Sequence, residues 1–239
     1  GIEIHAAAGY LIAAFLSGAS NRRTDEYGGT LERRARFLVE IIHAIRERLG
    51  KHYPVWCRLN GKEYGLEGGL TTEESCDTAR MAQSAGADAV HLHMLGVGSH
   101  GLAAFPSTPG GLVEFAERWK RAVRIPVIAV GRLNPEVGED VLREGKADFI
   151  AIGRGLIADP ELPNKAAEGR LEEIRPCIAC NKCGERVVYL SKEMRCSVNA
   201  AVGREGERRT RPAGARRKVL VVGGGPAGME AARVAALRG

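Results

Sequence analysis

The fold is decided by one stretch of sequence, Ile125-Pro-Val-Ile-Ala-Val130-Gly131-Arg132-Leu-Asn134-Pro135-Glu-Val-Gly-Glu-Asp-Val-Leu-Arg143-Glu-Gly-Lys-Ala147-Asp-Phe-Ile-Ala-Ile152-Gly153-Arg154. Its two short runs rich in Val, Ile and Ala, 125–130 and 147–152, predict strands. The segment between them predicts a helix over 135–143, with Asn134 as its cap and Pro135 at its first position. A strand, a helix and a strand in this order predict two parallel strands, and each of them ends in a Gly-Arg pair.

The same alternation runs through the residues before this stretch. Apolar runs predict three more strands, at 1–5, 54–59 and 88–92. Apolar residues at helical spacing predict helices at 31–49, 72–85 and 111–123, and short helices are expected up to about residue 168. This alternation predicts an α/β fold with a parallel sheet and outer helices. An open doubly wound sheet and a (β/α)8 barrel both satisfy the pattern.

The residues at the ends of the strands favour the barrel. The strands end at His5, Arg58, His91 or His93, Gly131-Arg132 and Gly153-Arg154. A ring of functional residues at the carboxyl ends of strands is typical of a barrel active site. We therefore predict the C-terminal part of a TIM (β/α)8 barrel, strands four to eight, over residues 1–170. On this prediction the sequence is a fragment truncated at both ends.

Two of these strand ends are candidate phosphate sites. Gly131-Arg132 and Gly153-Arg154 follow the last two predicted strands, where barrels commonly bind phosphate. Glycine lets backbone N–H groups approach an anion, and arginine adds charge. The alternative is a pair of tight turns with solvent-facing arginines. Arg58, inside an apolar run, needs either an anionic cofactor group or a structural ion pair.

Candidate proton donors follow two other strands. His5 and Tyr10 lie after the first strand, and His100 lies in a glycine-rich loop, 96–101. Tyrosine and histidine can transfer protons to a substrate in a barrel mouth. A packing or hydrogen-bonding role is the alternative for each of them, and it is our prediction for His91 and His93.

Four cysteines near the C-terminal end have the spacing of metal ligands. Cys177, Cys180, Cys183 and Cys196 form the pattern C-x2-C-x2-C-x12-C. Three thiolates in one run with a fourth further on favour an iron–sulfur cluster over residues 171–203. Zinc held by four cysteines remains open, as do disulfides.

A nucleotide-binding motif follows the cysteines. An apolar run at 218–222 leads into Gly223-Gly-Gly225-Pro-Ala-Gly228 and a helical segment over 229–237. G-x-G-x-x-G between a strand and a helix predicts the first β-α unit of a Rossmann-type domain at 218–239, where FAD and NAD(P) fit equally.

The composition of the chain limits the classes of partner that we expect it to bind. Of the formal net charge of +6, five charges come from the basic stretch that begins at Arg204 and ends at Lys218, within which 204–217 reads as a linker. The rest of the chain is nearly neutral, so we expect no nucleic acid partner. Without a secretory signal or an apolar run of about 18 residues, we expect a cytoplasmic protein, no membrane partner and a small-molecule substrate. A homo-oligomer is left open.

Taken together, these motifs resemble the class of old yellow enzyme-like flavoproteins that contains 2,4-dienoyl-CoA reductase and trimethylamine dehydrogenase. The segment from Ile2-Glu-Ile-His5 through Asn21-Arg-Arg-Thr-Asp25-Glu-Tyr-Gly-Gly29 to Phe37 resembles the class's sequence after barrel strand four. Ile152-Gly-Arg154 with Ala158-Asp-Pro160 resembles its phosphate loop. The four cysteines and the Gly223 motif resemble its linker and second domain.

The resemblance implies a cofactor for each part of the chain. The barrel would bind FMN, with Arg58 near the flavin ring and Gly131, Arg132, Gly153 and Arg154 at the phosphate. The cysteines would hold a [4Fe–4S] cluster. The Rossmann-type domain would carry FAD at Gly223, Gly225 and Gly228 and would receive electrons from NAD(P)H.

The resemblance also implies a reaction. Electrons would pass from NAD(P)H through FAD, the cluster and FMN to an activated alkene of the enoate or 2,4-dienoyl-CoA type. Tyr10 would donate the proton with His100 as its partner, and His5 would contact the substrate. Ala8 and Ala14 depart from the class, which usually has His or Asn and Gln or Glu there. An oxidative amine dehydrogenase or N-demethylase is the alternative, and a zinc-stabilised binding module without redox chemistry is the alternative from another class.

Overall fold

A computed structural model describes residues 1–101, 105–208 and 210–239. The chain divides into two compact units, Gly1–Cys180 and Asn181–Gly239. We describe each unit by itself. Arg209 of the predicted linker lies outside the described residues.

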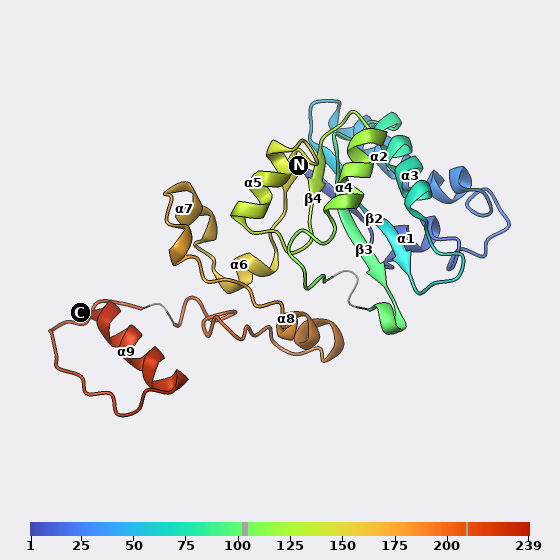
Figure 1. The fold of residues 1–239 in the computed structure, drawn as a ribbon. Coiled ribbons are helices and arrows are strands. Elements are labelled where there is room, and N and C mark those ends of the chain that lie inside the picture. Colours follow the sequence, from blue (N-terminus) through green and yellow to red (C-terminus); the bar gives the residue numbers. More distant parts are fainter. Residues whose placement is uncertain (102–104, 209) are drawn as a thin grey trace. The chain divides into compact units, whose positions relative to one another are not determined.

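The first unit is built on a five-stranded parallel sheet. Its strands are β1 (Ile2–Ala6), β2 (Val55–Tyr64), β3 (Ala89–Gly96), β4 (Val127–Ala129) and β5 (Phe149–Ile150). Their order in the sheet is β1-β2-β3-β4-β5, and every neighbouring pair is parallel (Figure 1). A doubly wound sheet reverses its strand order at a switch point, whereas a barrel keeps chain order. The order therefore agrees with the predicted run of consecutive barrel strands.

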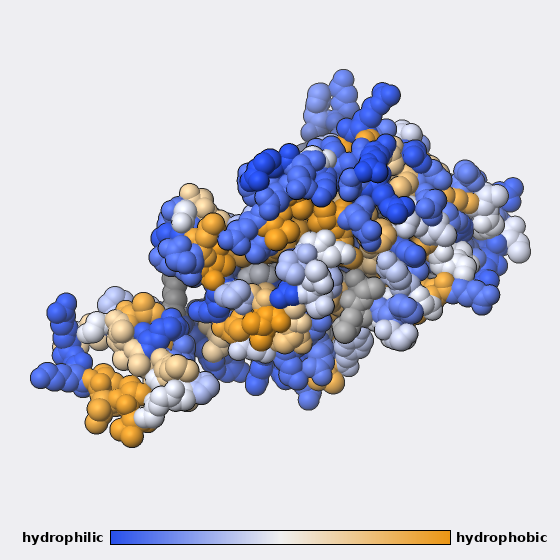
Figure 2. All heavy atoms as spheres, viewed as in Figure 1, coloured by the Kyte–Doolittle hydropathy of each residue, from blue (hydrophilic) through white to orange (hydrophobic). Residues whose placement is uncertain are grey.

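Helices connect the strands close to the predicted positions. They are α1 (Leu11–Leu16), α2 (Leu31–Leu49), α3 (Thr72–Ser84), α4 (Val113–Ala122), α5 (Pro135–Arg143), α6 (Arg154–Ala158) and α7 (Leu162–Ala167). Two helices begin at side-chain caps. Thr71 and Glu74 form a reciprocal capping box at α3, and the Asn134 side chain accepts a hydrogen bond from the Val137 N–H at α5. On the face that Figure 2 shows, hydrophilic side chains predominate over the upper part of this unit, with hydrophobic ones between them.

Two strands are longer than predicted and two are shorter. β2 continues past Leu59 to Tyr64 and pairs with β3 through a register shift between Asn60 and Glu63. These two polar residues lie beyond the predicted strand, yet both are buried, and they are hydrogen-bonded to each other. β4 and β5 keep only the central residues of their predicted runs. The predicted centres of all five strands are nevertheless confirmed.

The two faces of the sheet differ in character. On β3, Val90, Leu92 and Met94 are fully buried against the helices, in a core that includes Leu38 and Trp119. Each such side chain stabilises the fold by roughly 1.5–3 kcal/mol. Because side chains alternate along a strand, the intervening residues point to the opposite face. That face, the inside of the barrel in our interpretation, is polar: it carries Glu3, His5, Trp56, Arg58, His91 and His93.

The second unit has no sheet in its described residues. It contains α8 (Lys182–Gly184), a π-helical turn at Glu185–Tyr189 and α9 (Pro226–Arg238). The helix predicted after Gly228 is present as α9, with Gly225 as its cap. The strand predicted at 218–222 is wrong for this structure, since Leu220 and Val222 are 88% and 90% exposed. Strand hydrogen bonds need a partner strand, and the described residues of this unit supply none.

No helix in the described residues is both long and apolar enough to cross a membrane. The longest, α2, carries charged residues along its length.

Candidate active site

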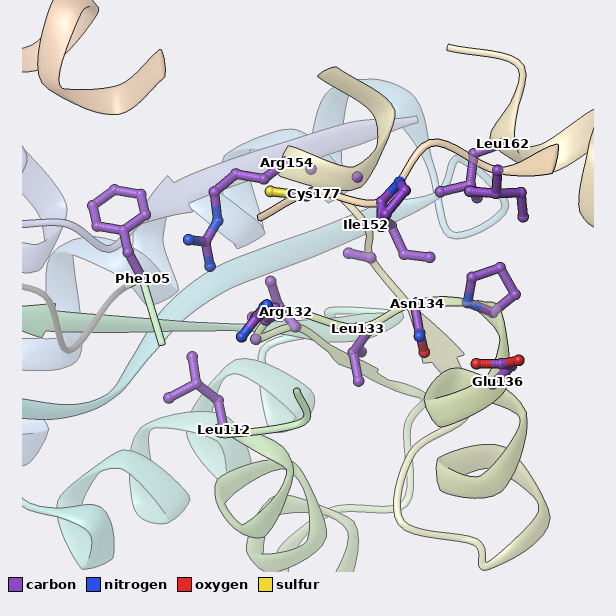
Figure 3. Close-up of a pocket in the computed structure, with 18 of the residues that line it drawn as sticks. Phe105, Leu112, Arg132, Leu133, Asn134, Glu136, Ile152, Arg154, Leu162 and Cys177 are labelled. Carbon is purple, nitrogen blue, oxygen red and sulfur yellow. The ribbon is translucent and has the colours of Figure 1, made fainter. Parts of the chain in front are cut away.

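A cavity of about 410 Å³ opens where the strands β2 to β5 end. It lies within the first unit, and Arg132, Arg154 and Cys177 border it together (Figure 3). The five residues predicted to bind the barrel cofactor all line it: Arg58, Gly131, Arg132, Gly153 and Arg154. The topology gathers them because parallel strands place their carboxyl ends at one edge. Glu136 is the one acidic residue among the lining side chains.

The loop after β4 requires glycine at its first position. Gly131 has a φ of 122°, and a Cβ there would lie 2.8 Å from the Leu112 side chain and 3.0 Å from its backbone nitrogen. Arg132 follows with a φ of 55°, in the left-handed region. A non-glycine residue there costs roughly 1–2 kcal/mol. Such strain recurs at ligand-binding loops, where it serves to aim a backbone or side chain.

The loop after β5 leaves room beside its backbone. A Cβ on Gly153 would meet no protein atom within 4 Å, and Gly153 lines the cavity. The next residue, Arg154, donates a hydrogen bond from Nη2 to the Pro106 carbonyl at 3.1 Å. Its guanidinium also lies 5.7 Å from the centre of the Phe105 ring. These contacts hold the Arg154 guanidinium at the edge of the cavity, next to the uncovered backbone of Gly153.

Arg58 approaches the cavity from β2 together with His93 from β3. Arg58 Nη2 and His93 Nδ1 are 3.1 Å apart, and both residues line the cavity. Burial, with the Arg58 charge added, lowers the pKa of His93 to about 3. In the described part of the chain Arg58 has no ion pair, and its buried Nε has no hydrogen-bond partner. The structural ion pair that was one alternative for Arg58 is therefore absent from these residues.

A second polar cluster lies on the same face of the sheet. Glu3 Oε2 accepts a hydrogen bond from Trp56 Nε1 at 2.6 Å and lies 2.7 Å from His91 Nδ1. Burial alone would raise the pKa of Glu3, but the bonds from His91 and Trp56 lower it overall. His91 is thus a hydrogen-bonded histidine of the sheet, as predicted.

The predicted proton donors fall into two groups. The rings of His5 and Tyr10 pack at a tilt of 56° with centres 5.1 Å apart, and Tyr10 is 62% exposed. His100 instead stacks on Tyr64 at 6.2 Å, and no ring contact joins it to Tyr10 within the described chain. Partial burial and the Arg58 charge lower the pKa of His5. None of these three lines the cavity, so their catalytic roles stay predictions.

Two further residues line the cavity that were not predicted to bind the cofactor. His93, predicted as a packing or hydrogen-bonding residue, is hydrogen-bonded to Arg58 there. Arg175 also lines the cavity, and its N–H donates to the buried Asp159 at 2.8 Å. Asp159 in turn pairs with Lys165 at 2.6 Å. Arg175 precedes Pro176-Cys177, so this network fixes the start of the cysteine segment to the barrel.

The four cysteines are divided between the two units. Cys177 and Cys180 belong to the first unit, and Cys183 and Cys196 belong to the second. Among the described residues, no group of three or more His, Cys, Asp or Glu side chains is arranged to hold a metal. Ala179 and Asn181, on either side of Cys180, have φ values of 54° and 56° and tighten the loop. Metal ligands commonly assemble only with the metal, so the cluster remains a prediction.

The glycines of the nucleotide motif have distinct local roles. A Cβ on Gly228 would lie 2.0 Å from the Gly223 carbonyl oxygen, and Gly223 has a φ of 113°. These two positions require glycine for the tight turn into α9. Nucleotide binding there is an untested prediction.

Consecutive parallel strands with a cationic cavity at their carboxyl ends are typical of part of a (β/α)8 barrel enzyme. In such barrels, cofactors with a phosphate group commonly bind at the loops after the last strands. The chain belongs to the NADH:flavin oxidoreductase / NADH oxidase family, whose model matches residues 1–173.

The relatives extend the match to the second unit. The chain is 48% identical to NADH oxidase of Thermoanaerobacter brockii, over 100% of this chain and 37% of that protein. A structure of 2-naphthoyl-CoA reductase with 2-naphthoyl-CoA matches with a TM-score of 0.93 at 43% identity, covering 100% and 37% of the two chains. Histamine dehydrogenase from Rhizobium sp. 4-9 matches with a TM-score of 0.86 at 35% identity, covering 100% and 35%. The chain thus spans little more than a third of the relatives' length.

The cavity residues fit FMN, the flavin of this family. The volume of about 410 Å³ is in the range of cofactor pockets. The half-buried Arg58 suits an acceptor-rich partner, because its buried Nε has no hydrogen-bond partner among the described residues and an unpaired buried polar group is costly. The space beside the Gly153 backbone would be filled by any larger side chain.

Proposed function

We propose that this chain supplies the FMN site of an NAD(P)H-dependent flavoenzyme that reduces an activated alkene. The observation that carries the proposal is the cavity: two Gly-Arg loops and Arg58 converge on it, with a single acidic residue in its lining. The similarity to 2-naphthoyl-CoA reductase supports a conjugated acyl-CoA or enoate as the substrate.

In this proposal the two Gly-Arg loops bind the phosphate. The backbone N–H groups around Gly131 and Gly153 approach it closely, and Arg132 and Arg154 add positive charge. Arg58, which lines the cavity from β2, would face the flavin ring, where its charge would favour an electron-rich ring. When bound, FMN supplies hydride chemistry that no side chain can provide.

The substrate side of the proposal uses the loop between β1 and α1. Tyr10 is exposed, its hydroxyl can donate a proton to the reduced alkene, and the His5 ring packs against it at a tilt. His100, on the loop after β3, is the proposed partner of Tyr10. A Tyr10→Phe change should slow alkene reduction and leave flavin reduction by NAD(P)H intact.

The remaining cofactors form a proposed electron path. Cys177, Cys180, Cys183 and Cys196 would hold a [4Fe–4S] cluster, and Cys177 already borders the cavity. FAD would lie at the Gly223 motif and take electrons from NAD(P)H. An iron–sulfur cluster transfers electrons one at a time, whereas a flavin can transfer one electron or two. A cluster can therefore carry electrons between FAD and FMN.

One observation favours an alternative reaction. Histamine dehydrogenase is 35% identical over the whole chain, so oxidation of an amine is the second candidate. Anaerobic spectra of the full-length protein distinguish the two. Bleaching of the flavin by NADH or NADPH, with recovery on adding an enoyl-CoA, supports the reductase. Bleaching by an amine without nicotinamide supports the dehydrogenase.

The FMN site itself is tested by binding. We expect Arg132→Ala and Arg154→Ala each to weaken FMN binding by about tenfold or more, the effect of one charge-assisted hydrogen bond. Arg118→Ala, on the exposed surface of α4, is the matched control and should bind FMN normally. Equal affinities in all three variants would exclude the cavity as the site.

A further inference from the structure

His93 makes the one side-chain hydrogen bond that Arg58 has in the described part of the chain. In the pairing of β2 with β3, Arg58 lies opposite His91 and Asn60 lies opposite His93. Arg58 therefore reaches diagonally to His93, with 3.1 Å between Nη2 and Nδ1. Both side chains line the cavity, whereas His91 does not.

The contact determines the state of the imidazole. An arginine guanidinium can only donate hydrogen bonds, so His93 Nδ1 must accept and its proton must lie on Nε2. A protonated His93 could not accept and would repel the guanidinium. Burial and the Arg58 charge lower the pKa of His93, in agreement with a neutral ring.

Arg58 depends on this contact for its orientation. Its side chain has several rotatable bonds, and ordering them costs up to about 2 kcal/mol. Among the described residues no carboxylate pairs with it, and its Nε is buried without a partner. The strand therefore places the Arg58 backbone, and among the described residues His93 is the hydrogen-bond partner that orients the guanidinium.

We propose that His93 is a positioning residue of the flavin site, whose neutral imidazole holds the Arg58 guanidinium toward the flavin ring. The inference rests on the proposed FMN site and assigns a role to a side chain that itself need not touch FMN. A histidine serves here because it is a compact, uncharged acceptor. A carboxylate at this position would neutralise the charge that Arg58 brings to the ring.

The first test is FMN affinity and midpoint potential in the full-length protein. Flavin-free His93→Leu should bind FMN about tenfold more weakly, since a hydrogen bond to a charged group is lost. Its bound flavin should have a more negative potential, because the cation is no longer held at the ring. His93→Asn places an amide oxygen near the Nδ1 position and should restore both values. His91→Leu, the matched histidine on the same face, should leave both near normal.

A double-mutant cycle separates positioning from packing. If His93 acts through Arg58, His93→Leu should have no further effect on FMN affinity in an Arg58→Leu background. The double variant also replaces a half-buried polar pair by two apolar side chains, so we expect it to fold even if the single variant does not. Additive losses would overturn the inference, as would normal binding and potential in His93→Leu. Failure of the unaltered protein to bind FMN overturns the proposed function, and this inference with it.

Discussion

Asn60 joins the end of β2 to the loop that carries Tyr10. Its side-chain oxygen accepts a hydrogen bond from the Ala8 N–H at 3.1 Å, and its amide nitrogen donates to Glu63 at 3.1 Å. Ala8 has a φ of 58°, a left-handed conformation that alanine rarely adopts. The bond from Asn60 therefore holds a strained turn in place, directly before the candidate proton donor.

Asn60→Ala should loosen this turn. It leaves the Ala8 N–H and the buried Glu63 carboxylate each short of one partner, which costs about 1–3 kcal/mol of unfolding free energy. Urea unfolding measures the loss, and hydrogen exchange should show faster exchange at Ala8. Ser20→Ala removes an exposed bond to the Ala14 carbonyl and is the control, with a change under about 0.5 kcal/mol. Equal losses in both variants would argue against a special role for Asn60.

The stability of the first unit should depend on pH through His93. The unfolded chain protonates this residue near pH 6.5, whereas the folded pKa is about 3. The unfolded state therefore binds one more proton between these values, and stability falls as pH drops below 6.5. The slope from this group is about 1.4 kcal/mol per pH unit.

The pH effect is measured as a difference between two proteins. In urea unfolding at pH 7.5, 6 and 5, the free energy of unfolding of the unaltered protein should fall relative to that of His93→Asn as the pH drops. Carboxylates common to both proteins cancel in the difference. Parallel curves would show that His93 is not held neutral by the fold.

We expect the alkylation of each cysteine to depend on its burial and on whether a metal cluster is bound. Burial raises the pKa of the Cys57 thiol to about 12, so iodoacetamide at pH 8 should leave it unmodified in the native protein. Cys180 is exposed and should be alkylated in metal-free protein but protected in protein with a reconstituted cluster. Cys76, which is half-buried and outside the motif, should label equally in both. Identical labelling of Cys180 with and without metal would exclude it as a ligand, and protection by zinc in colourless protein would favour the zinc alternative.

The sequence predicted the barrel strands and the cavity residues because both follow from local patterns. The predicted bounds of α2 and α5 match the structure, since apolar spacing and the caps at Asn134 and Gly50 act within a few residues. The diagonal contact between Arg58 and His93 was not predictable in this way. It depends on the register of two strands, which a single sequence does not reveal. The prediction of a strand at 218–222 was wrong for a related reason, because an apolar run forms a strand only beside a partner strand.

Two glycine substitutions should separate folding from flavin binding. Gly131→Ala should destabilise the fold by about 1–3 kcal/mol, because the new Cβ clashes with Leu112 and the φ of 122° disfavours alanine.

Gly153→Ala meets no protein atom within 4 Å and has a φ of −88°, so its thermal stability without FMN should be unchanged or slightly higher. Its methyl group would, however, occupy space beside the backbone that we assign to the phosphate. We therefore expect Gly153→Ala to lose about tenfold or more in FMN affinity, a cost near 1.4 kcal/mol, measured by fluorescence titration. Normal FMN binding by a stable Gly153→Ala protein would show that the phosphate lies elsewhere. Weak FMN binding at full stability would support a phosphate position beside the Gly153 backbone.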